Sequence, residues 1–595
     1  MTARPPTLVS DALVDFLLYE VLDATSLTRL PAFADHGRDT FDPWLATCRR
    51  LGQDLLFPAY KAMDAEPPRL EVGEVRVHPR MHLLWRELVK AGVIASARPF
   101  EVGGQQLPLT VATFASAYLM AGNLSAYAFA GLTAGAAHLI EAFGDADLKE
   151  RFMRPMYSGE ITGTMALTEP QAGSSLADVQ TRATPTVGGH YLVRGSKMFI
   201  SAGDHDLTEN IVHLVLARIE GAPPGTRGIS LFAVPRLRTS DRGTPVKNDV
   251  HVSGMVHKMG WRGVPSLALS FGDAGDCHGW LVGPRHQGLR CMFQMMNEAR
   301  IMVGLNAAAT ASVAYHESVR YSLERRQGRP LGVDDPIRPP VEIAAHPDVR
   351  RMLLRQKAIV EGALCLLGVT ARYADLAEHS SDAVTRERSR LLLDLLTPIA
   401  KTFPAERGFE SNALALQIHG GYGYSSELLA EAWLRDQKLN SIHEGTSGVQ
   451  ALDLLGRKVL GGGGAALVAL REEVLADLGE AEGAGLPSAR VARVHEALEQ
   501  ILALTRTLAE RGAGGDAEGM LAHATDYLEA FSIVIIAWMW TKMATRAAPR
   551  GDDLAHGIEH AARYWSAAEL PRVPALVALC QSGDRSYLDL RPEGL

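Results

Sequence analysis

Residues 440–450, N-S-I-H-E-G-T-S-G-V-Q, place one carboxylate, Glu444, between a histidine and a glycine that precedes a hydroxyl residue. The glycine permits a tight turn or a close approach to a ligand, and no obvious ion-pair partner stands at helical spacing on both sides. Three roles are open for this carboxylate: a charge at a helix terminus, an ordinary surface acid, or a catalytic base facing a pocket. Most glutamates are solvated, so the rest of the chain must decide.

Three other stretches combine glycine with hydroxyl, amide or aromatic groups: 165–175 (M-A-L-T-E-P-Q-A-G-S-S), 196–201 (S-K-M-F-I-S) and 417–424 (Q-I-H-G-G-Y-G-Y). Taken singly, they are explained by a β-turn, a strand with a buried phenylalanine and a helix-ending loop. A further stretch, Y-S-L-E-R-R-Q-G-R, is expected to end a helix with Arg325, Arg326 and Arg329 within one turn. A solvated basic patch is the ordinary explanation, but guanidinium groups also suit phosphate oxygens.

The size and charge of the chain narrow the class of protein. At 595 residues the chain is too long for one core and predicts roughly three or four domains. Its 47% hydrophobic and 22% charged residues are typical of a soluble globular protein. The formal net charge of -8 argues against general nucleic-acid binding, although it leaves room for an anionic ligand on a local arginine cluster.

Cysteine spacing and apolar runs bear on the cellular compartment. Five scattered cysteines show no C-x-x-C pair and no metal-ligand spacing, which predicts a reduced, cytoplasmic protein without a metal site. The N-terminus carries acids and little arginine, so no targeting segment is expected. The most apolar run, F-S-I-V-I-I-A-W-M-W at 531–540, is shorter than the about 20 residues that span a bilayer. A buried helix, without integral membrane association, is therefore expected there.

The hydrophobic period changes along the chain and predicts the elements that must position these groups. Residues 45–160 have a helical pattern, and short β-rich runs separated by Gly, Pro and Asp follow it. A helical pattern returns from Met292, and the tetraglycine at 461–464 predicts a hinge or linker before further helices. The expected domains are an N-terminal helical domain, a compact antiparallel β domain, a helical bundle and an extra C-terminal helical domain, at 1–162, 163–285, 286–460 and 465–595.

The stretches at 165–175, 196–201, 417–424 and 434–446 (L-R-D-Q-K-L-N-S-I-H-E-G-T), in this order and within this helix–β–helix layout, resemble the flavin-dependent acyl-CoA dehydrogenases. The resemblance runs from about residue 50 to 460. The region after 465 makes the chain similar to the long subgroup that includes 3-methylmercaptopropionyl-CoA dehydrogenases and some mycobacterial-type fatty acyl-CoA dehydrogenases. The resemblance implies an α+β, mainly α fold in which the third domain is a four-helix bundle carrying the catalytic base.

The resemblance also implies FAD as the cofactor. The stretch at 165–175 would bind the flavin ring through free backbone N–H groups and hydroxyls, Phe199 would stack where the family usually has Trp, and Arg325 would bind the pyrophosphate. Gly328 stands where many members have Phe. The residues expected to contact FAD are Met165, Leu167, Thr168, Gly173, Ser174, Phe199, Ile200, Ser201, Arg325, Gln417, Gly420, Gly421, Thr446 and Gly448.

Glu444 then matches the family's base. It would remove the α-proton of a thioester whose carbonyl is polarised by the Glu444 backbone N–H and a flavin ribityl hydroxyl, while the β-hydrogen leaves as hydride to flavin N5. Burial of the carboxylate would raise its pKa toward the operating pH. Some relatives carry the base directly before Arg300, where this chain has Ala299, and Glu298 is a poor second candidate. Residues expected to contact the substrate are Ser174, Asn297, Arg300 and Gly445; Asn297 replaces an Asp, His443 a Tyr and Gly448 a Gln of relatives.

The expected reaction is oxidation of an acyl-CoA to the trans-2-enoyl-CoA, with electrons passed to an electron-transfer flavoprotein. The alternatives are an oxidase or flavin monooxygenase on the same fold, or a catalytically silent acyl-CoA-binding scaffold. In relatives the loop at 417–421 reaches a neighbour's FAD, which implies at least a homodimer. Small residues between Ala121 and Ala137 allow either a deep acyl pocket or close helix packing. We expect short to medium acyl-CoAs, including the 3-methylmercaptopropionyl thioether.

Overall fold

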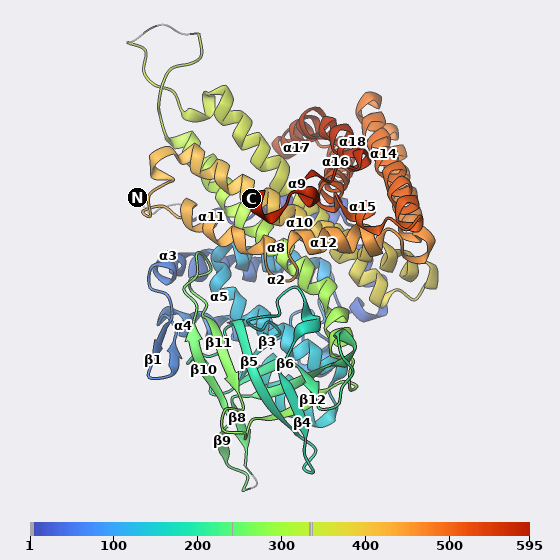
Figure 1. The fold of residues 1–595 in the computed structure, drawn as a ribbon. Coiled ribbons are helices and arrows are strands. Elements are labelled where there is room, and N and C mark those ends of the chain that lie inside the picture. The colour runs from blue at the N-terminus through green and yellow to red at the C-terminus, as the bar shows by residue number, and fades with distance from the viewer. Residues whose placement is uncertain (1–4, 241, 333–334, 336, 595) are drawn as a thin grey trace. The chain divides into compact units, whose positions relative to one another are not determined.

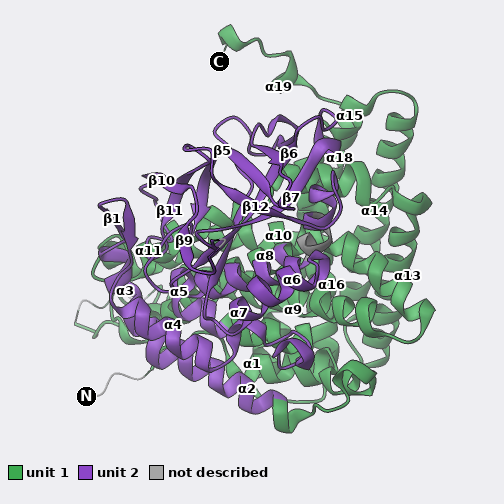
Figure 2. Ribbon diagram, turned by 90° about the horizontal axis from the view of Figure 1, so that it is seen from below, with its two compact units in different colours: residues 1–40, 108–117, 300–595 green, residues 41–107, 118–299 purple. Residues whose placement is uncertain are grey.

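The computed structural model of the 595-residue chain describes residues 5–594 except 241, 333, 334 and 336, and it does not describe the side chains of 293–297. The described chain forms two compact units, coloured separately in Figure 2. Unit 1 comprises residues 1–40, 108–117 and 300–595, and unit 2 comprises residues 41–107 and 118–299. The units are defined by contacts rather than by chain order, so the predicted division into four consecutive domains stays a prediction.

Unit 2 begins with helices, as the sequence predicts, but contains an additional hairpin. The helices in or entering this part are α2 (Arg38–Arg50), α3 (Phe57–Ala65), α4 (Arg80–Lys90), α5 (Leu109–Phe143), α6 (Ala146–Leu148) and α7 (Arg154–Tyr157). Strands β1 (Arg69–Glu71) and β2 (Glu74–Arg76) pair antiparallel between α3 and α4. Each has three residues and mostly exposed side chains, which leaves too short a pattern for the sequence to reveal.

An eight-stranded sheet forms most of the rest of unit 2 and can be followed by its strand labels in Figure 1. Its path is β10-β11-β5-β12-β7-β6-β3, and β4 pairs with both β5 and β6. The pairings are antiparallel except that β3 and β4 each run parallel to β6, which corrects the expectation of a wholly antiparallel domain. The strands of this sheet are β3 (Thr162–Ala166), β4 (Arg182–Pro185), β5 (Tyr191–Ser201), β6 (Ile211–Ile219), β7 (Ile229–Pro235), β10 (Val250–Met255), β11 (Ser266–Phe271) and β12 (His278–Val282). Strands β8 (Leu237–Thr239) and β9 (Pro245–Lys247) form a separate hairpin.

Small residues in the long helix α5 serve close packing within unit 2. A Cβ added to Gly122 would lie 2.7 Å from the carbonyl oxygen of Gly52. A Cβ added to Gly163 at the start of the sheet would lie 2.5 Å from the Cβ of Ala136. Of the two explanations open for the small residues of this helix, close packing therefore accounts for the ones that the structure constrains.

Unit 1 is helical, and its centre is the antiparallel pair α9 (Pro347–His379) and α10 (Ala383–His419). Asp382 caps α10 by accepting the N–H of Thr385. The other helices before the tetraglycine are α1 (Asp11–Phe16), the C-terminal part of α8 (Gly288–Glu324), α11 (Ala430–Lys438) and α12 (Ser447–Asp453). The tetraglycine separates these from the later helices: Gly462, Gly463 and Gly464 have φ of 55°, 67° and 86°, a run of left-handed residues that glycine accommodates readily.

The helices after the tetraglycine include α16 (Ala524–Ala547), which packs against several of the others, and they appear in orange and red in Figure 1. They are α13 (Ala465–Gly483), α14 (Ser488–Ala513), α15 (Ala517–Leu521), α17 (Asp553–Tyr564), α18 (Val573–Ser582) and α19 (Ser586–Asp589). Helix α16 is long and apolar enough to cross a membrane, but 89% of its apolar window is buried inside the protein. Residues 531–540 are all buried, which confirms the expected buried helix.

Candidate active site

Glu444 lies on a strained turn between η12 (Leu439–Ser441) and α12. Its φ is 52°, in the left-handed region that a glutamate rarely adopts, and Gly445 follows with φ 88°. The residue is exposed. Conformations of this kind cost energy and persist only where neighbouring contacts impose them. The structure therefore holds Glu444 on a turn rather than in a regular helix.

Three side chains hold this turn. Gln450, which is fully buried, donates from Nε2 to the Glu444 carbonyl at 3.2 Å. The hydroxyl of Thr446 accepts the N–H of Val449 at 3.3 Å and caps α12. The ring Nδ1 of His443 lies 2.9 Å from the Leu439 carbonyl oxygen. Gln450 was not among the predicted site residues, because a buried glutamine in a helix has no distinctive spacing.

The charges of α8 and α10 act on the Glu444 carboxylate. Desolvation by the surrounding protein raises the pKa of Glu444, and this effect outweighs the positive charges of Lys401 and Arg300, which lower the pKa. Arg300 is 4% exposed and donates to Asp453 at 2.7 Å. The predicted substrate residue Arg300 thus forms a buried ion pair close to the base, while Gly445 and Gly448 lie in or next to the turn itself.

Glu298, the second candidate for the base, has a different environment in unit 2. Its carboxylate lies 3.3 Å from Nδ1 of His138. Burial alone would raise the pKa of Glu298, but the hydrogen bond to His138 and the charges of His138 and Arg98 outweigh burial and lower the pKa. A carboxylate with a lowered pKa is a weaker proton acceptor. The electrostatics therefore favour Glu444.

In unit 2, the loop after β3 is held by a buried ion pair. Lys197 donates to Glu169 at 2.8 Å and to the Leu167 carbonyl at 3.0 Å, and the two side chains of the pair are 0% and 3% exposed. Glu169 also accepts the Thr181 hydroxyl at 2.6 Å. The Met198 N–H donates to the Thr168 carbonyl at 2.9 Å. These bonds fix the segment from Leu167 to Glu169 against β5.

Strand β5 bulges where the stacking aromatic is expected. Its register against β11 shifts between Leu267 and Leu269, and Phe199 opposite has φ 60°. The Phe199 side chain is 57% exposed, whereas Ile200 is 2% exposed and belongs to the core of the sheet. The bulge therefore presents an aromatic face, and Ile200 offers a ligand only its backbone. Ser201 is half-buried at the end of the strand.

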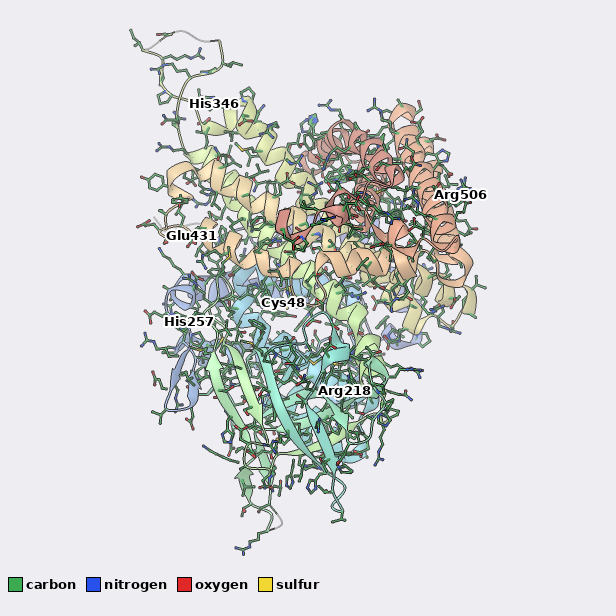
Figure 3. The ribbon with its side chains drawn as sticks, viewed as in Figure 1. Cys48, Arg218, His257, His346, Glu431 and Arg506 are labelled. Atoms are coloured by element: carbon green, nitrogen blue, oxygen red, sulfur yellow. The ribbon has the colours of Figure 1, made fainter. Side chains whose placement is uncertain are left out.

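The loop continues past the exposed residues Gly173 and Ser174 and is anchored beyond them by Arg218 of β6, labelled in Figure 3. The Arg218 side chain donates from Nε to the Val179 carbonyl at 2.7 Å. No described atom lies within 4 Å of a Cβ added to Gly173, so its backbone borders open space. Met165 lies within β3, paired with Leu214 of β6.

The other predicted cofactor residues belong to unit 1. Gln417, Gly420 and Gly421 are exposed at the end of α10, and among the described residues no atom lies within 4 Å of a Cβ added to either glycine. Arg325 is exposed, but α8 ends at Glu324. The expected single helical turn of three arginines is therefore wrong: the chain extends after Glu324, and Arg326 pairs with Glu342 at 2.7 Å. The side chain of Asn297 lies outside the described part of the structure.

The two sets of residues suit a flavin dinucleotide by their chemistry. In unit 2 an exposed aromatic face stands beside a loop with open backbone and hydroxyl groups, which suits a planar heteroaromatic ring. In unit 1 open glycines and an exposed arginine suit phosphate oxygens. The residues present therefore fit the group that the motifs imply.

The amino-acid sequence matches known protein families along most of its length. Four family profiles match successive parts of the chain: "Acyl-CoA dehydrogenase, N-terminal domain" at 48–160, "middle domain" at 164–274, "C-terminal domain" at 286–460, and "Acetyl-CoA dehydrogenase C-terminal like" at 471–591. The chain belongs to the acyl-CoA dehydrogenase family. It is accordingly an enzyme of the FAD-dependent acyl-CoA dehydrogenase class, which confirms the predicted family and cofactor.

Individual relatives agree with this assignment. A 3-methylmercaptopropionyl-CoA dehydrogenase of Ruegeria pomeroyi is 38% identical over 74% of this chain and 74% of its own. A butyryl-CoA dehydrogenase of Syntrophomonas wolfei is 37% identical over 75% of this chain and 74% of its own. The crystal structure of an acyl-CoA dehydrogenase from Bacillus anthracis, complexed with FAD, shares the fold at TM-score 0.75 and 20% identity, covering 96% of this chain and 92% of that one. The predicted mainly α fold with a middle β domain is confirmed.

Proposed function

We propose that this acyl-CoA dehydrogenase removes one hydrogen from each of the α- and β-carbons of a short to medium acyl-CoA, with Glu444 as the base. The observation that carries the proposal is the Glu444 turn: a carboxylate with a raised pKa on a strained turn that buried Gln450 holds in place. A general base works best when its pKa is near the operating pH. Desolvation of the Glu444 carboxylate raises its pKa from the ordinary glutamate value, toward neutral pH.

Glu444 would accept the α-proton on a carboxylate oxygen, and the backbone of the same turn would polarise the thioester carbonyl. The N–H groups of a strained turn are fixed in direction before the substrate arrives, so they stabilise developing negative charge without reorganisation. The turn requires glycine at 445, because a Cβ there would lie 2.5 Å from Nε2 of Gln450, the group that bonds the Glu444 carbonyl. Arg300, bound to Asp453, supports the proposal as a buried charge near the base rather than as a free ligand group.

Bound FAD would supply the two-electron oxidant that acts at the β-carbon. We propose that Phe199, Ser201 and the loop of Thr168, Gly173 and Ser174 hold its ring system, with Met165, Leu167 and the Ile200 backbone behind them. Arg325, Gln417, Gly420 and Gly421 would bind its pyrophosphate, from the same or a second subunit, and Thr446 and Gly448 would border it. The open glycines and the exposed Phe199 support this assignment.

The names of two relatives, and not the helix α5, support the proposed substrate range. Two relatives at 38% and 37% identity are named for 3-methylmercaptopropionyl-CoA and butyryl-CoA, both short acyl groups. Each buried methylene contributes about 0.8 kcal/mol, so a pocket for long chains would show kcat/KM rising up to fourfold per carbon until it is full. We expect the rise to stop at short to medium length. A specificity constant still rising at sixteen carbons would contradict this.

We further propose an electron-transfer flavoprotein as the electron acceptor and a homodimer as the smallest functional assembly. An oxidase or monooxygenase on the same fold would instead pass electrons to oxygen, and a silent scaffold would pass none. Anaerobic addition of acyl-CoAs to the purified yellow protein distinguishes a dehydrogenase from an oxidase or monooxygenase and from a silent scaffold. Bleaching of the flavin that persists until an electron-transfer flavoprotein is added supports the proposal. Rapid recolouring by air alone favours an oxidase, and no bleaching with any thioester contradicts dehydrogenation.

A further inference from the structure

Gln450 bonds three successive carbonyl groups of the Glu444 turn. Its side-chain Nε2 donates to the carbonyl oxygen of Glu444 at 3.2 Å and, in a longer bond, to that of Gly445 at 3.5 Å. Its backbone N–H donates to the carbonyl oxygen of Thr446 at 3.0 Å. Both side-chain partners are acceptors, so the amide nitrogen must face them. The residue is fully buried within α12, and water therefore does not compete for these bonds.

The strained part of the turn depends on the Gln450 side chain. Glu444 and Gly445 have φ of 52° and 88°, and such a conformation persists only where neighbouring contacts impose it. The contacts of His443 and Thr446 act on the two flanks of the turn, through the Leu439 carbonyl and the start of α12. Among the described residues, no group other than the Gln450 amide bonds the carbonyls of Glu444 and Gly445.

The bonds to Gln450 also fix the direction of a backbone N–H group. The described peptide bonds are trans, so the carbonyl of Glu444 and the N–H of Gly445, which share one peptide group, point in opposite directions. Because the carbonyl points to the buried amide of Gln450, the Gly445 N–H points away from it. The N–H groups of Glu444 and Gly445 have no acceptor within the described part of the chain. The turn therefore carries unbonded donors beside the proposed base.

We propose that Gln450 is a positioning residue that fixes the backbone N–H groups of the Glu444 turn in the direction that polarises the thioester carbonyl. The proposal rests on the proposed function, in which Glu444 is the base and its turn binds the thioester. Gln450 is fully buried, so it acts through the peptide groups of Glu444 and Gly445 rather than on the substrate. Donors fixed in advance stabilise developing negative charge without reorganisation, and a turn that is free to relax loses this advantage.

Gln450→Met tests this, because methionine has a similar volume and no hydrogen-bond donor. Removal of one fixed donor to a developing oxyanion lowers kcat about 10²–10³-fold, so donors that are loosened rather than removed should cost roughly tenfold or more. The KM for the acyl-CoA should change little, because the bonds to the carbonyl strengthen mainly in the transition state. A rise in KM with unchanged kcat would overturn the proposal, since it would mean that Gln450 supports binding alone.

A chromophoric ligand gives a readout that a purely structural role would not change. An aryl-substituted enoyl-CoA absorbs at longer wavelength when hydrogen bonds draw electrons toward its carbonyl oxygen, and difference spectra at saturation record the shift. The wild type and Glu444→Gln, which keep the turn, should both produce it, and Gln450→Met should lose most of it. Gln450→Asn keeps the amide but is one carbon shorter, so it should lose the shift as well and serves if the methionine variant does not accumulate.

Gln356 in α9 offers a matched control. It is also fully buried and donates from Nε2 to a backbone carbonyl, that of Ser411 in α10, at 2.9 Å. In both glutamines Oε1 makes no hydrogen bond to the described residues. Gln356→Met should therefore lower the melting temperature about as much as Gln450→Met, while kcat and the spectrum of the bound ligand stay at their wild-type values.

The outcomes separate this proposal from the role of Glu444. If Glu444→Gln retains turnover, the role of Glu444 as the base fails. An inactive Glu444→Gln beside a Gln450→Met with the wild-type kcat and spectral shift refutes the role of Gln450 alone. Equal losses of the spectral shift in Gln450→Met and Gln356→Met would mean that the bundle is merely loosened, which also overturns the proposal.

Discussion

Removal of Lys197 should loosen the loop that is proposed to bind the flavin. In the folded protein its ammonium donates to Glu169 at 2.8 Å and to the Leu167 carbonyl at 3.0 Å, with both side chains of the pair buried. Breaking one partner out of a buried pair costs roughly 3–5 kcal/mol, because the other charge stays desolvated. For a unit of this size that corresponds to a fall in melting temperature of about 10 °C.

The assay is Lys197→Met followed by thermal unfolding with and without added FAD, and by titration of FAD into the apoprotein. We expect a lower melting temperature, weaker FAD binding, and partial recovery of both when Glu169→Gln is added to Lys197→Met. Lys247→Met is the matched control, since Lys247 is 86% exposed and lies 3.9 Å from Glu74. An exposed pair contributes at most about 1 kcal/mol. If the Lys197 and Lys247 variants melt alike and bind FAD alike, the reasoning is refuted.

Three other measurements follow from the structure. Gly173→Ala should leave the melting temperature of the apoprotein unchanged, since no described atom lies within 4 Å of the new Cβ, but weaken FAD binding; unchanged affinity would remove Gly173 from the site. Asp375→Ala should lower stability by about 1–2 kcal/mol because this buried side chain caps α5, whereas the exposed cap variant Asp382→Ala should cost less. Burial raises the pKa of Glu169, but the charge of Lys197 and the hydrogen bonds to Glu169 outweigh burial, so the pKa is lowered in the folded protein. The ionised Glu169 therefore stabilises the fold above the ordinary glutamate pKa, and this stabilisation is lost as the pH falls through the pKa of the folded state. Acid unfolding of Glu169→Gln should be correspondingly less steep.

Local sequence patterns predict the parts of this fold whose contacts are local. The helical period before and after the β domain, the buried run of α16 and the left-handed tetraglycine each follow from residues close together in the chain. The hairpin of β1 and β2 is missed because three-residue exposed strands have no alternation. The parallel pairing of β3 with β6 is missed because it depends on strands that are distant in sequence.

Local sequence patterns likewise predict some residues of the candidate site and miss others. Glu444, Gly445 and Gly173 are recognisable because glycine-rich turns beside reactive groups leave a local signal. Gln450 carries no such signal, since it is an ordinary residue in a helix and acts on the turn through a hydrogen bond to the Glu444 carbonyl. The sequence misses the end of α8 at Glu324, because residues with good helix propensity continue past the point where the bridge between Arg326 and Glu342 ends the helix.

The most direct test of the central claim is the turnover of Glu444→Gln, loaded with FAD and supplied with an acyl-CoA and an electron acceptor. Glutamine has the same size and keeps the backbone N–H groups of the turn, so FAD and acyl-CoA should still bind with near wild-type affinity. Turnover should fall at least 10²–10⁴-fold, the ordinary contribution of a general base. A variant that binds both ligands and turns over at a near-normal rate would contradict the account and make Glu298 the next residue to examine.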